Sequence, residues 1–204
     1  PLTNTWSSAG SMSAGREWVR ATMLGNGKVL ATGGQNGPTA LANADLYDPA
    51  NNSWAPTTPM PAVRTTHTQT TLPDGRALVA NGNNATAIVY DPATAGWSFT
   101  EAMGGSRAHS GATLLQSGKV LVAGGSSNSS AEIYDPSTNA WTPTGTMSQP
   151  RMFHRLTSLP DGRVLVTGGI SSLGGAAKSA AEIYDPGAGV WSAAPSMSAA
   201  RQEH

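Results

Sequence analysis

The 204-residue chain has no cysteine, so disulfide bonds, thiol catalysis and cysteine metal sites are all excluded. Charged residues make up only 12%, about half of the usual share, and the formal net charge is zero. The longest basic cluster is the pair Arg16 and Arg20, so we expect no nucleic-acid partner. Because no run of 18 apolar residues occurs, we also expect no membrane span.

Glycine and proline, by contrast, are abundant, with 24 and 14 residues. Both residue types favour turns, so this composition predicts a turn-rich, all-β protein. The chain begins at Pro1 with neither a basic n-region nor an apolar h-region, and we expect any signal peptide to have been removed. Composition alone assigns no activity.

Self-similarity along the chain is the strongest signal in the sequence. Trp recurs every 43 to 50 residues, Met follows each of these Trp by six residues, and Arg follows each Met by four. Tyr-Asp-Pro stands seven residues before each of the last four Trp. A Gly-Gly doublet recurs in three copies and becomes Asn81-Gly82 in another. All changes in length fall between this doublet and the Tyr, so one connection per repeat varies while the rest is constant.

Each repeat predicts four short strands. The first follows the Arg, as at residues 67–72, and a tight turn such as Ser117-Gly118 comes next. The second strand, as at residues 119–123, is almost entirely apolar, which predicts burial on both faces. The third, as at residues 131–134, stops at Asp-Pro, and the fourth contains Trp141. A four-stranded unit that cannot bury its own faces predicts a blade of a β-propeller.

The Gly doublet, the Tyr and the Trp six residues before a Met resemble the kelch repeat across essentially the whole chain. Segments 159–169 and 181–186 are similar to bacterial kelch proteins related to galactose oxidase. The resemblance implies an all-β, kelch-type β-propeller with four full four-stranded blades plus partial strands at both ends. It also implies a bacterial protein that is extracellular or at the cell surface.

We expect residues 1–204 to form one kelch propeller domain or a segment of one. Residues 1–12 should form an outer strand, and residues 198–204 should start a further inner strand. The expected blades span about 13–60, 61–103, 104–147 and 148–197. Kelch rings generally have more than four blades, which favours a segment of a larger propeller. A four-bladed ring and a ring shared between chains remain alternatives.

The residues that start the inner strands are expected to surround the central channel, and they are the candidate binding residues. They are Trp18, Arg64, His67, His109, Arg151 and His154. Trp18 breaks the repeat, because its position holds Thr, His and Phe in the other copies. The recurring Arg and His have a second interpretation, as hydrogen-bonding groups between blades, which their repetition favours. Converging His side chains can bind a transition metal, but we expect no metal site.

The resemblance to galactose oxidase implies a copper site with two Tyr and two His, one Tyr being linked to a Cys. This chain has no Cys, and its four Tyr all lie on predicted third strands. Phe153 stands beside His154 where the resemblance places a ligand Tyr. Glu132 and Glu182 are expected to pair with a neighbouring Arg or Lys. We therefore predict no catalytic residue and no cofactor.

The favoured function is a non-catalytic binding or scaffolding propeller with an unknown protein or glycan ligand. One alternative is a segment of a galactose-oxidase-like copper oxidoreductase. Another is a self-assembling structural module, joined through the edge strands of its blades. The long variable connections, residues 35–44 and 170–181, lie on one face and are further candidates for binding.

Overall fold

The computed structural model describes residues 6–82 and 84–203. These residues form strands and turns without any helix, so no membrane-spanning helix is found among them. Four antiparallel, four-stranded sheets follow one another along the chain, each with its strands in sequence order. The expected all-β fold with four four-stranded blades is therefore confirmed.

The blades are numbered in chain order. Blade 1 contains β1 (Arg20–Met23), β2 (Val29–Thr32), β5 (Ala44–Asp48) and β6 (Ser53–Thr57). Blade 2 contains β7 (Thr68–Thr71), β8 (Ala77–Ala80), β9 (Ala87–Asp91) and β10 (Gly96–Phe99). Blade 3 contains β11 (Gly111–Leu114), β12 (Val120–Ala123), β13 (Ala131–Asp135) and β14 (Ala140–Thr144). Blade 4 contains β15 (Arg155–Ser158), β16 (Val164–Thr167), β17 (Ala181–Asp185) and β18 (Val190–Ala194).

The tight turn after each inner strand has the conformation that its X-Gly pair predicts. A glycine in each turn has φ between +81° and +86°, which a residue with a Cβ adopts only at a cost. These glycines are Gly27, Gly75, Gly118 and Gly162. The turns return the chain beside the inner strand, so each second strand lies in the interior of its sheet.

The second strand of blade 3 shows why this segment is apolar throughout. Val120 and Val122 pack against blade 2, whereas Leu121 and Ala123 pack against blade 4. Successive side chains of a strand point to opposite faces of the sheet, and here a neighbouring blade covers each face. All four residues of β12 are buried, which confirms the burial on both faces that the sequence predicts.

The recurring Trp side chains connect neighbouring blades. Trp141 packs against Tyr134 of its own blade, with ring centroids 5.1 Å apart. Its indole Nε1 donates a hydrogen bond to Thr100 Oγ1, at the end of the preceding blade, over 3.0 Å. Trp97 and Trp191 donate in the same way to backbone carbonyls of their preceding blades. These Trp side chains therefore stabilise the packing between blades, as their fixed spacing predicts.

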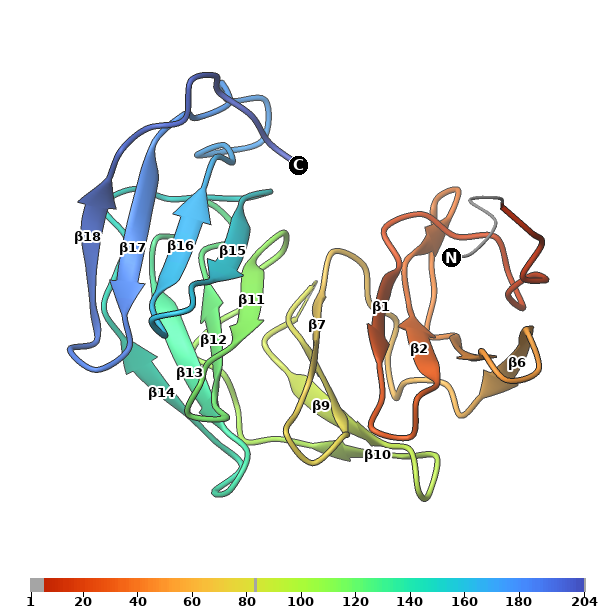
Figure 1. Cartoon of the computed structure of the whole chain (residues 1–204). Coiled ribbons are helices and arrows are strands. Elements are labelled where there is room, and N and C mark those ends of the chain that lie inside the picture. The colour runs from red at the N-terminus through yellow and green to blue at the C-terminus, as the bar shows by residue number, and fades with distance from the viewer. Residues whose placement is uncertain (1–5, 83, 204) are drawn as a thin grey trace.

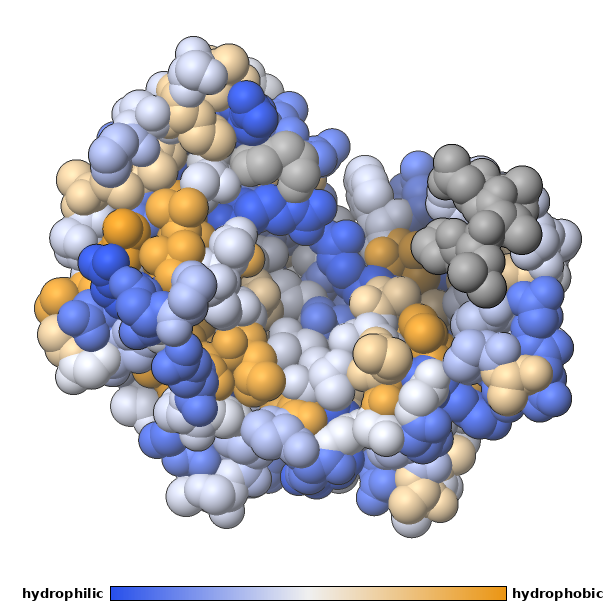
Figure 2. Space-filling view, viewed as in Figure 1, coloured by the Kyte–Doolittle hydropathy of each residue, from blue (hydrophilic) through white to orange (hydrophobic). Residues whose placement is uncertain are grey.

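The four blades form an open arc rather than a closed ring. Their inner strands pack in the order β1, β7, β11 and β15, and Figure 1 shows blade 1 and blade 4 at the two ends of the arc. In the space-filling view, the molecule is hollowed between these two end blades (Figure 2). Inner strands of all four blades therefore border one central space.

At the two ends of the chain, the described residues contain none of the expected partial strands. Residues 6–12 form no strand, and residues 1–5 lie outside the described part of the chain. At the other end, Arg201 makes a single bridge with Lys178, and no strand follows it through residue 203.

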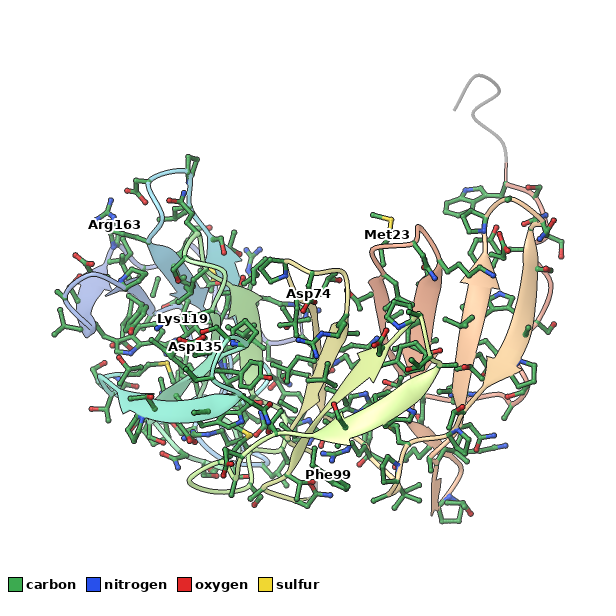
Figure 3. The ribbon with its side chains drawn as sticks, turned by 90° about the horizontal axis from the view of Figure 1, so that it is seen from below. Met23, Asp74, Phe99, Lys119, Asp135 and Arg163 are labelled. Carbon is green, nitrogen blue, oxygen red and sulfur yellow. The ribbon has the colours of Figure 1, made fainter. Side chains whose placement is uncertain are left out.

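Exposed ion pairs lie near the turn between the first and second strands of each blade. Lys119 pairs with Asp135 at 2.9 Å in blade 3, and Figure 3 shows the two side chains together. Hydrogen bonds from Ser137 and Lys119 hold the pKa of Asp135 well below its usual range. Exposed pairs of this kind contribute little to stability.

Candidate functional site

A cavity of about 330 Å³ lies at the centre of the arc, among the inner strands of all four blades. Its volume is at the lower end of the range for small-molecule pockets. The lining residues are Trp18, Arg20, Thr66, Thr68, Gln69, His109, Ser110, Gly111, Ala112, Phe153, His154, Arg155, Leu156 and Glu203. Figure 2 shows the hollow between the end blades, with hydrophilic surface where the last blade borders it.

Equivalent residues of successive repeats form the mouth of this cavity, each two positions after the recurring Arg. All have a left-handed backbone, with φ between +52° and +59°, although none is glycine. They are Trp18, Thr66, His109, Phe153 and Glu203. We call these five residues the mouth residues. Left-handed backbone at a bulky or β-branched residue costs on the order of 1 to 3 kcal/mol and is concentrated at functional sites.

Backbone hydrogen bonds between blades hold the mouth residues in place. The amide of His109 donates to the carbonyl of Thr66 at 3.1 Å, and that of Phe153 donates to the carbonyl of His109 at 3.1 Å. The amide of Glu203 continues the series by donating to the carbonyl of Phe153 at 3.0 Å. From Thr66 onward, each mouth residue thus orients the next one along the chain.

Aromatic rings from three blades meet at the mouth. The rings of His109 and Phe153 have centroids 3.9 Å apart and planes at 37°. Trp18 approaches His109 edge-on, with centroids 5.9 Å apart, and 47% of its surface is exposed. Burial and the charge of Arg20 lower the pKa of His109, so its ring is neutral at pH 7. The mouth therefore offers a flat, largely uncharged surface to a ligand.

Two guanidinium groups border the cavity beneath this aromatic surface. Arg20 and Arg155 occupy equivalent positions, as the first residues of β1 and β15. Arg20 Nε donates to the carbonyl of His67 at 3.0 Å, and none of the described residues accepts from its two Nη atoms. Burial lowers the pKa of Arg20 and the charge of Arg155 lowers it further, whereas Glu203 acts in the opposite direction.

His67 and His154 follow mouth residues but are buried between blades. The Thr32 hydroxyl donates to Gln69 Oε1 at 2.6 Å, so His67 Nε2 donates to that hydroxyl at 2.9 Å. Ala123 holds the equivalent place in blade 3 and offers His154 no hydroxyl. The carbonyls of Ala123 and Arg151 lie near the His154 ring but outside hydrogen-bond geometry, and both ring nitrogens lack a partner.

The two buried imidazoles are neutral at pH 7. Burial lowers the pKa of His67 to about 3, with help from the charges of Arg20 and Arg64. Burial and the charge of Arg151 lower the pKa of His154 to about 4, while the nearby carbonyls act in the opposite direction. Of this pair, only His154 lines the cavity. Its unpartnered nitrogens are buried in the wall of the cavity.

The recurring Arg belongs to the core rather than to the cavity. Arg107 pairs with Glu132 at 2.8 Å, and Arg151 pairs with Glu182 at 3.1 Å, as predicted for the two Glu residues. Each guanidinium also donates to carbonyls at the Gly doublet and at the start of the third strand. Arg16 makes the equivalent pair with Asp45 in blade 1. In these blades, the recurring Arg thus joins the second strand, the third strand and the connection between them.

Blade 2 departs from this arrangement. Arg64 is 1% exposed and has no carboxylate partner among the described residues, because Ile88 stands where the other blades have Asp or Glu. In the other blades, that carboxylate also accepts from the backbone amide after the recurring Met. Blade 2 has Pro61 at that place, which has no amide hydrogen to donate. Burial lowers the pKa of Arg64 to about 10.

The structure brings three of the six candidate binding residues to the cavity, namely Trp18, His109 and His154. The other three, Arg64, His67 and Arg151, are buried in the packing between blades and do not line it. A binding role for the first three remains a prediction. Sequence reasoning missed Arg20 and Arg155, although their position breaks the repeat in the way that Trp18 does.

The described residues do not fit the copper site that the resemblance implies. The four Tyr rings pack against the recurring Trp rings, away from the cavity. Their hydroxyl groups bond to Asn or Thr side chains. Phe153 has no ligand atom, and no three His, Cys, Asp or Glu among the described residues could hold a metal together. We derive no copper chemistry from this chain.

Comparison with known proteins agrees with the fold. The kelch-motif family model matches residues 21–61, 107–148 and 157–198, in blades 1, 3 and 4. The chain is 38% identical over 58 residues to Kelch-like protein 35 of Mus musculus. That match covers 28% of this chain and 10% of the relative's length. Kelch repeats typically mediate protein–protein interaction and are generally non-enzymatic. Together with the four repeated blades, these matches show that the chain belongs to the kelch-repeat family.

Proposed function

We propose that the chain is a non-catalytic binding module that recognises its partner at the cavity mouth. The observation that carries the proposal is the series of mouth residues with left-handed backbone and no glycine. Such strained backbone persists only where the surrounding structure enforces it, and here it presents side chains to one opening. Among the protein and glycan ligands expected from the sequence, the family favours a protein.

The long variable connections extend this binding face. Glu17, next to Trp18, bridges to Gln35 at the start of one long connection, which forms the short hairpin β3 (Gln35–Asn36) and β4 (Thr39–Ala40). Met152, next to Phe153, bridges to Ile170 at the start of the other. Both connections therefore begin beside mouth residues, and a partner at the mouth could contact them as well.

Selection from a phage-displayed peptide library, with a glycan array in parallel, tests this proposal. Trp18→Ser removes an exposed aromatic side chain at the mouth. Phe99→Ser is the matched control, because Phe99 is 58% exposed on β10 and does not line the cavity. We expect selected ligands to bind the wild type and the Phe99 variant but not the Trp18 variant. Ligands that depend on Phe99, or no selection at all, would overturn the proposal.

We also propose, from the resemblance, that the parent protein is bacterial and extracellular or at the cell surface. The low charge and the absence of cysteine are compatible with that location and do not specify it. Antibody labelling of intact and permeabilised source cells tests it. Labelling of intact cells is expected, and labelling only after permeabilisation would contradict the proposal.

A second candidate function is self-assembly, which the end faces of the arc favour. Leu121 and Met147, on the face of blade 3 toward blade 4, are 0% and 3% exposed. Their equivalents on the free face of blade 4, Leu165 and Met197, are only half-buried. At the other end of the arc, Met23 of blade 1 is 64% exposed. Between neighbouring blades of the chain, faces of this kind pack against each other. The end blade of a second copy would therefore offer a matching surface to the free face of blade 4.

Light scattering over a concentration series tests this second candidate. A discrete dimer or larger closed species that Leu165→Glu dissociates would support assembly through the end face. Leu173→Glu is the matched control, because Leu173 is 73% exposed in a long connection. A monomer of 20.8 kDa at every concentration would exclude this function.

A further inference from the structure

The central cavity combines basic side chains, flat aromatic rings and polar side chains in one small volume. We propose that it binds a small aromatic carboxylate, with the carboxylate on Arg20 and the ring against the aromatic mouth residues. The inference goes beyond the proposed function, because it assigns a separate, small ligand to the cavity behind the mouth.

Arg20 is the group in the cavity best suited to an anion. Its Nε is occupied by the His67 carbonyl, which fixes the guanidinium at the wall of the cavity. Its two Nη atoms have no acceptor among the described residues, and a guanidinium presents paired donors that match the two oxygens of a carboxylate. Arg155 is a second basic residue in the lining, and Glu203 is the only acidic residue among the described residues that line it.

The aromatic mouth residues select the rest of the ligand. Trp18, His109 and Phe153 come from three different blades and meet within ring-contact distances. A flat ring bound beside them replaces water on their exposed faces and gains aromatic contacts. The neutral state of His109 avoids placing a third cation there. The volume of about 330 Å³ accommodates a single ring with one or two substituents and excludes a folded chain segment.

Polar side chains in the lining favour a ligand with one further hydrogen-bonding group. The unpartnered nitrogens of His154 and the Thr66 hydroxyl are themselves buried, and Gly111 packs directly against His154 Nε2. The hydroxyl side chains of Thr68 and Ser110 also line the cavity. A ring hydroxyl can both donate and accept, which suits hydroxyl groups of this kind.

Isothermal titration calorimetry with 4-hydroxybenzoate and its neutral analogue 4-hydroxybenzamide tests the proposal. The two probes have nearly the same shape and differ in charge. We expect the carboxylate to bind with a Kd at or below about 1 mM and the amide to bind about tenfold more weakly or worse. Equal binding of both probes, or binding of neither, would overturn the proposal.

Two variants locate the binding. Arg20→Met keeps the aliphatic stem and removes the charge, so it should abolish the preference for the carboxylate. Arg76→Met is the matched control, because Arg76 pairs with Asp74 in an exposed turn and should change nothing. If Arg20→Met unfolds the chain, Trp18→Leu on the exposed mouth must weaken both probes about equally. A carboxylate preference that survives Arg20→Met would contradict the assigned site.

This experiment separates the ligand class from the proposed function. If peptides or glycans are selected at the mouth but neither probe binds, the ligand class is wrong and the binding face stands. If a probe binds in the cavity while the mouth selects no peptide or glycan, a small-molecule site remains without a macromolecular partner.

Discussion

Replacing Glu132 with Ile in blade 3 would copy the arrangement that blade 2 has at Ile88. In blade 3, the buried carboxylate accepts from Arg107 Nε at 3.1 Å and from Arg107 Nη2 at 2.8 Å. It also accepts from the amide of Gly104 at 2.8 Å. Glu132→Ile therefore leaves a buried guanidinium without its counter-charge and an amide without an acceptor.

The expected loss of unfolding free energy is about 3 to 5 kcal/mol, the range found when one partner of a buried ion pair is removed. Arg107 keeps its bonds to the carbonyls of Gly124 and Ser130 and to the Ser130 hydroxyl. These bonds keep the loss within that range, because part of the guanidinium remains satisfied. A domain of this size is stable by only about 5 to 15 kcal/mol, so the loss is readily measurable.

Blade 2 also predicts the compensating change. Its Pro61 stands where blade 3 has Gly104, so no amide there requires an acceptor. Gly104→Pro alone should cost about 1.5 to 3 kcal/mol, because it removes a hydrogen bond to a charged group. In the Glu132→Ile background this hydrogen bond is already lost, and because Gly104 is exposed, water can bond to its amide, so the same change should cost little. The two substitutions should therefore couple by about 1.5 kcal/mol or more.

Urea denaturation followed by tryptophan fluorescence, analysed as a double-mutant cycle, measures these values. Ile88→Val is the control, because it shortens the equivalent side chain where no ion pair exists, at a cost of about 0.5 to 1.5 kcal/mol. A loss below about 1 kcal/mol for Glu132→Ile would refute the assigned role of the ion pair. Strict additivity of the two substitutions would refute the link to the amide.

Three further predictions concern the core around the cavity. Because burial lowers the pKa of His67 to about 3 and of His154 to about 4, the unfolded chain binds protons first as the pH falls. The unfolding free energy should be constant above pH 6.5 and fall by up to about 1.4 kcal/mol per pH unit for each of these His residues between pH 6.5 and 4. Urea denaturation at several pH values measures this dependence, and an unfolding free energy that does not change with pH would contradict the burial of the two His residues in their neutral form. Ala123→Ser should give His154 a hydroxyl partner and raise the unfolding free energy by about 1 kcal/mol, and a loss would show that the site has no room. Gly124→Ala should lower the unfolding free energy by more than about 2 kcal/mol, because φ at Gly124 is +66° and a Cβ there would lie 2.5 Å from the Arg151 carbonyl oxygen. An unchanged midpoint of urea denaturation would refute that close approach.

Much of the fold follows from residues that repeat. The spacing of Trp, Met and Tyr-Asp-Pro predicted four four-stranded blades, and the apolar run at residues 119–123 predicted a strand buried on both faces. These features are local, since turn chemistry and side-chain alternation act within a few residues. The open arc is compatible with the segment of a larger propeller that the sequence favoured, but its curvature depends on the angle between blades, which no short pattern encodes.

The candidate site was predictable only in part. A residue that recurs at one position of every blade, such as Arg151, has a role that every blade needs, and that role is in the core. Trp18 breaks the repeat, and the structure places it at the cavity. Arg20 and Arg155 break it in the same way, so comparing repeats position by position could have found them. Nothing in the sequence predicted the left-handed backbone of the mouth residues, because none of them is glycine.

The indole N–H resonances of the six tryptophans, followed by NMR while 4-hydroxybenzoate is added, would locate ligand binding residue by residue. Trp18 lies at the cavity mouth, whereas Trp97, Trp141 and Trp191 donate hydrogen bonds between blades. Binding in the cavity predicts a saturable shift of the Trp18 resonance and no change in those three. Shifts spread over the inter-blade tryptophans, or an unmoved Trp18, would contradict binding at the cavity mouth.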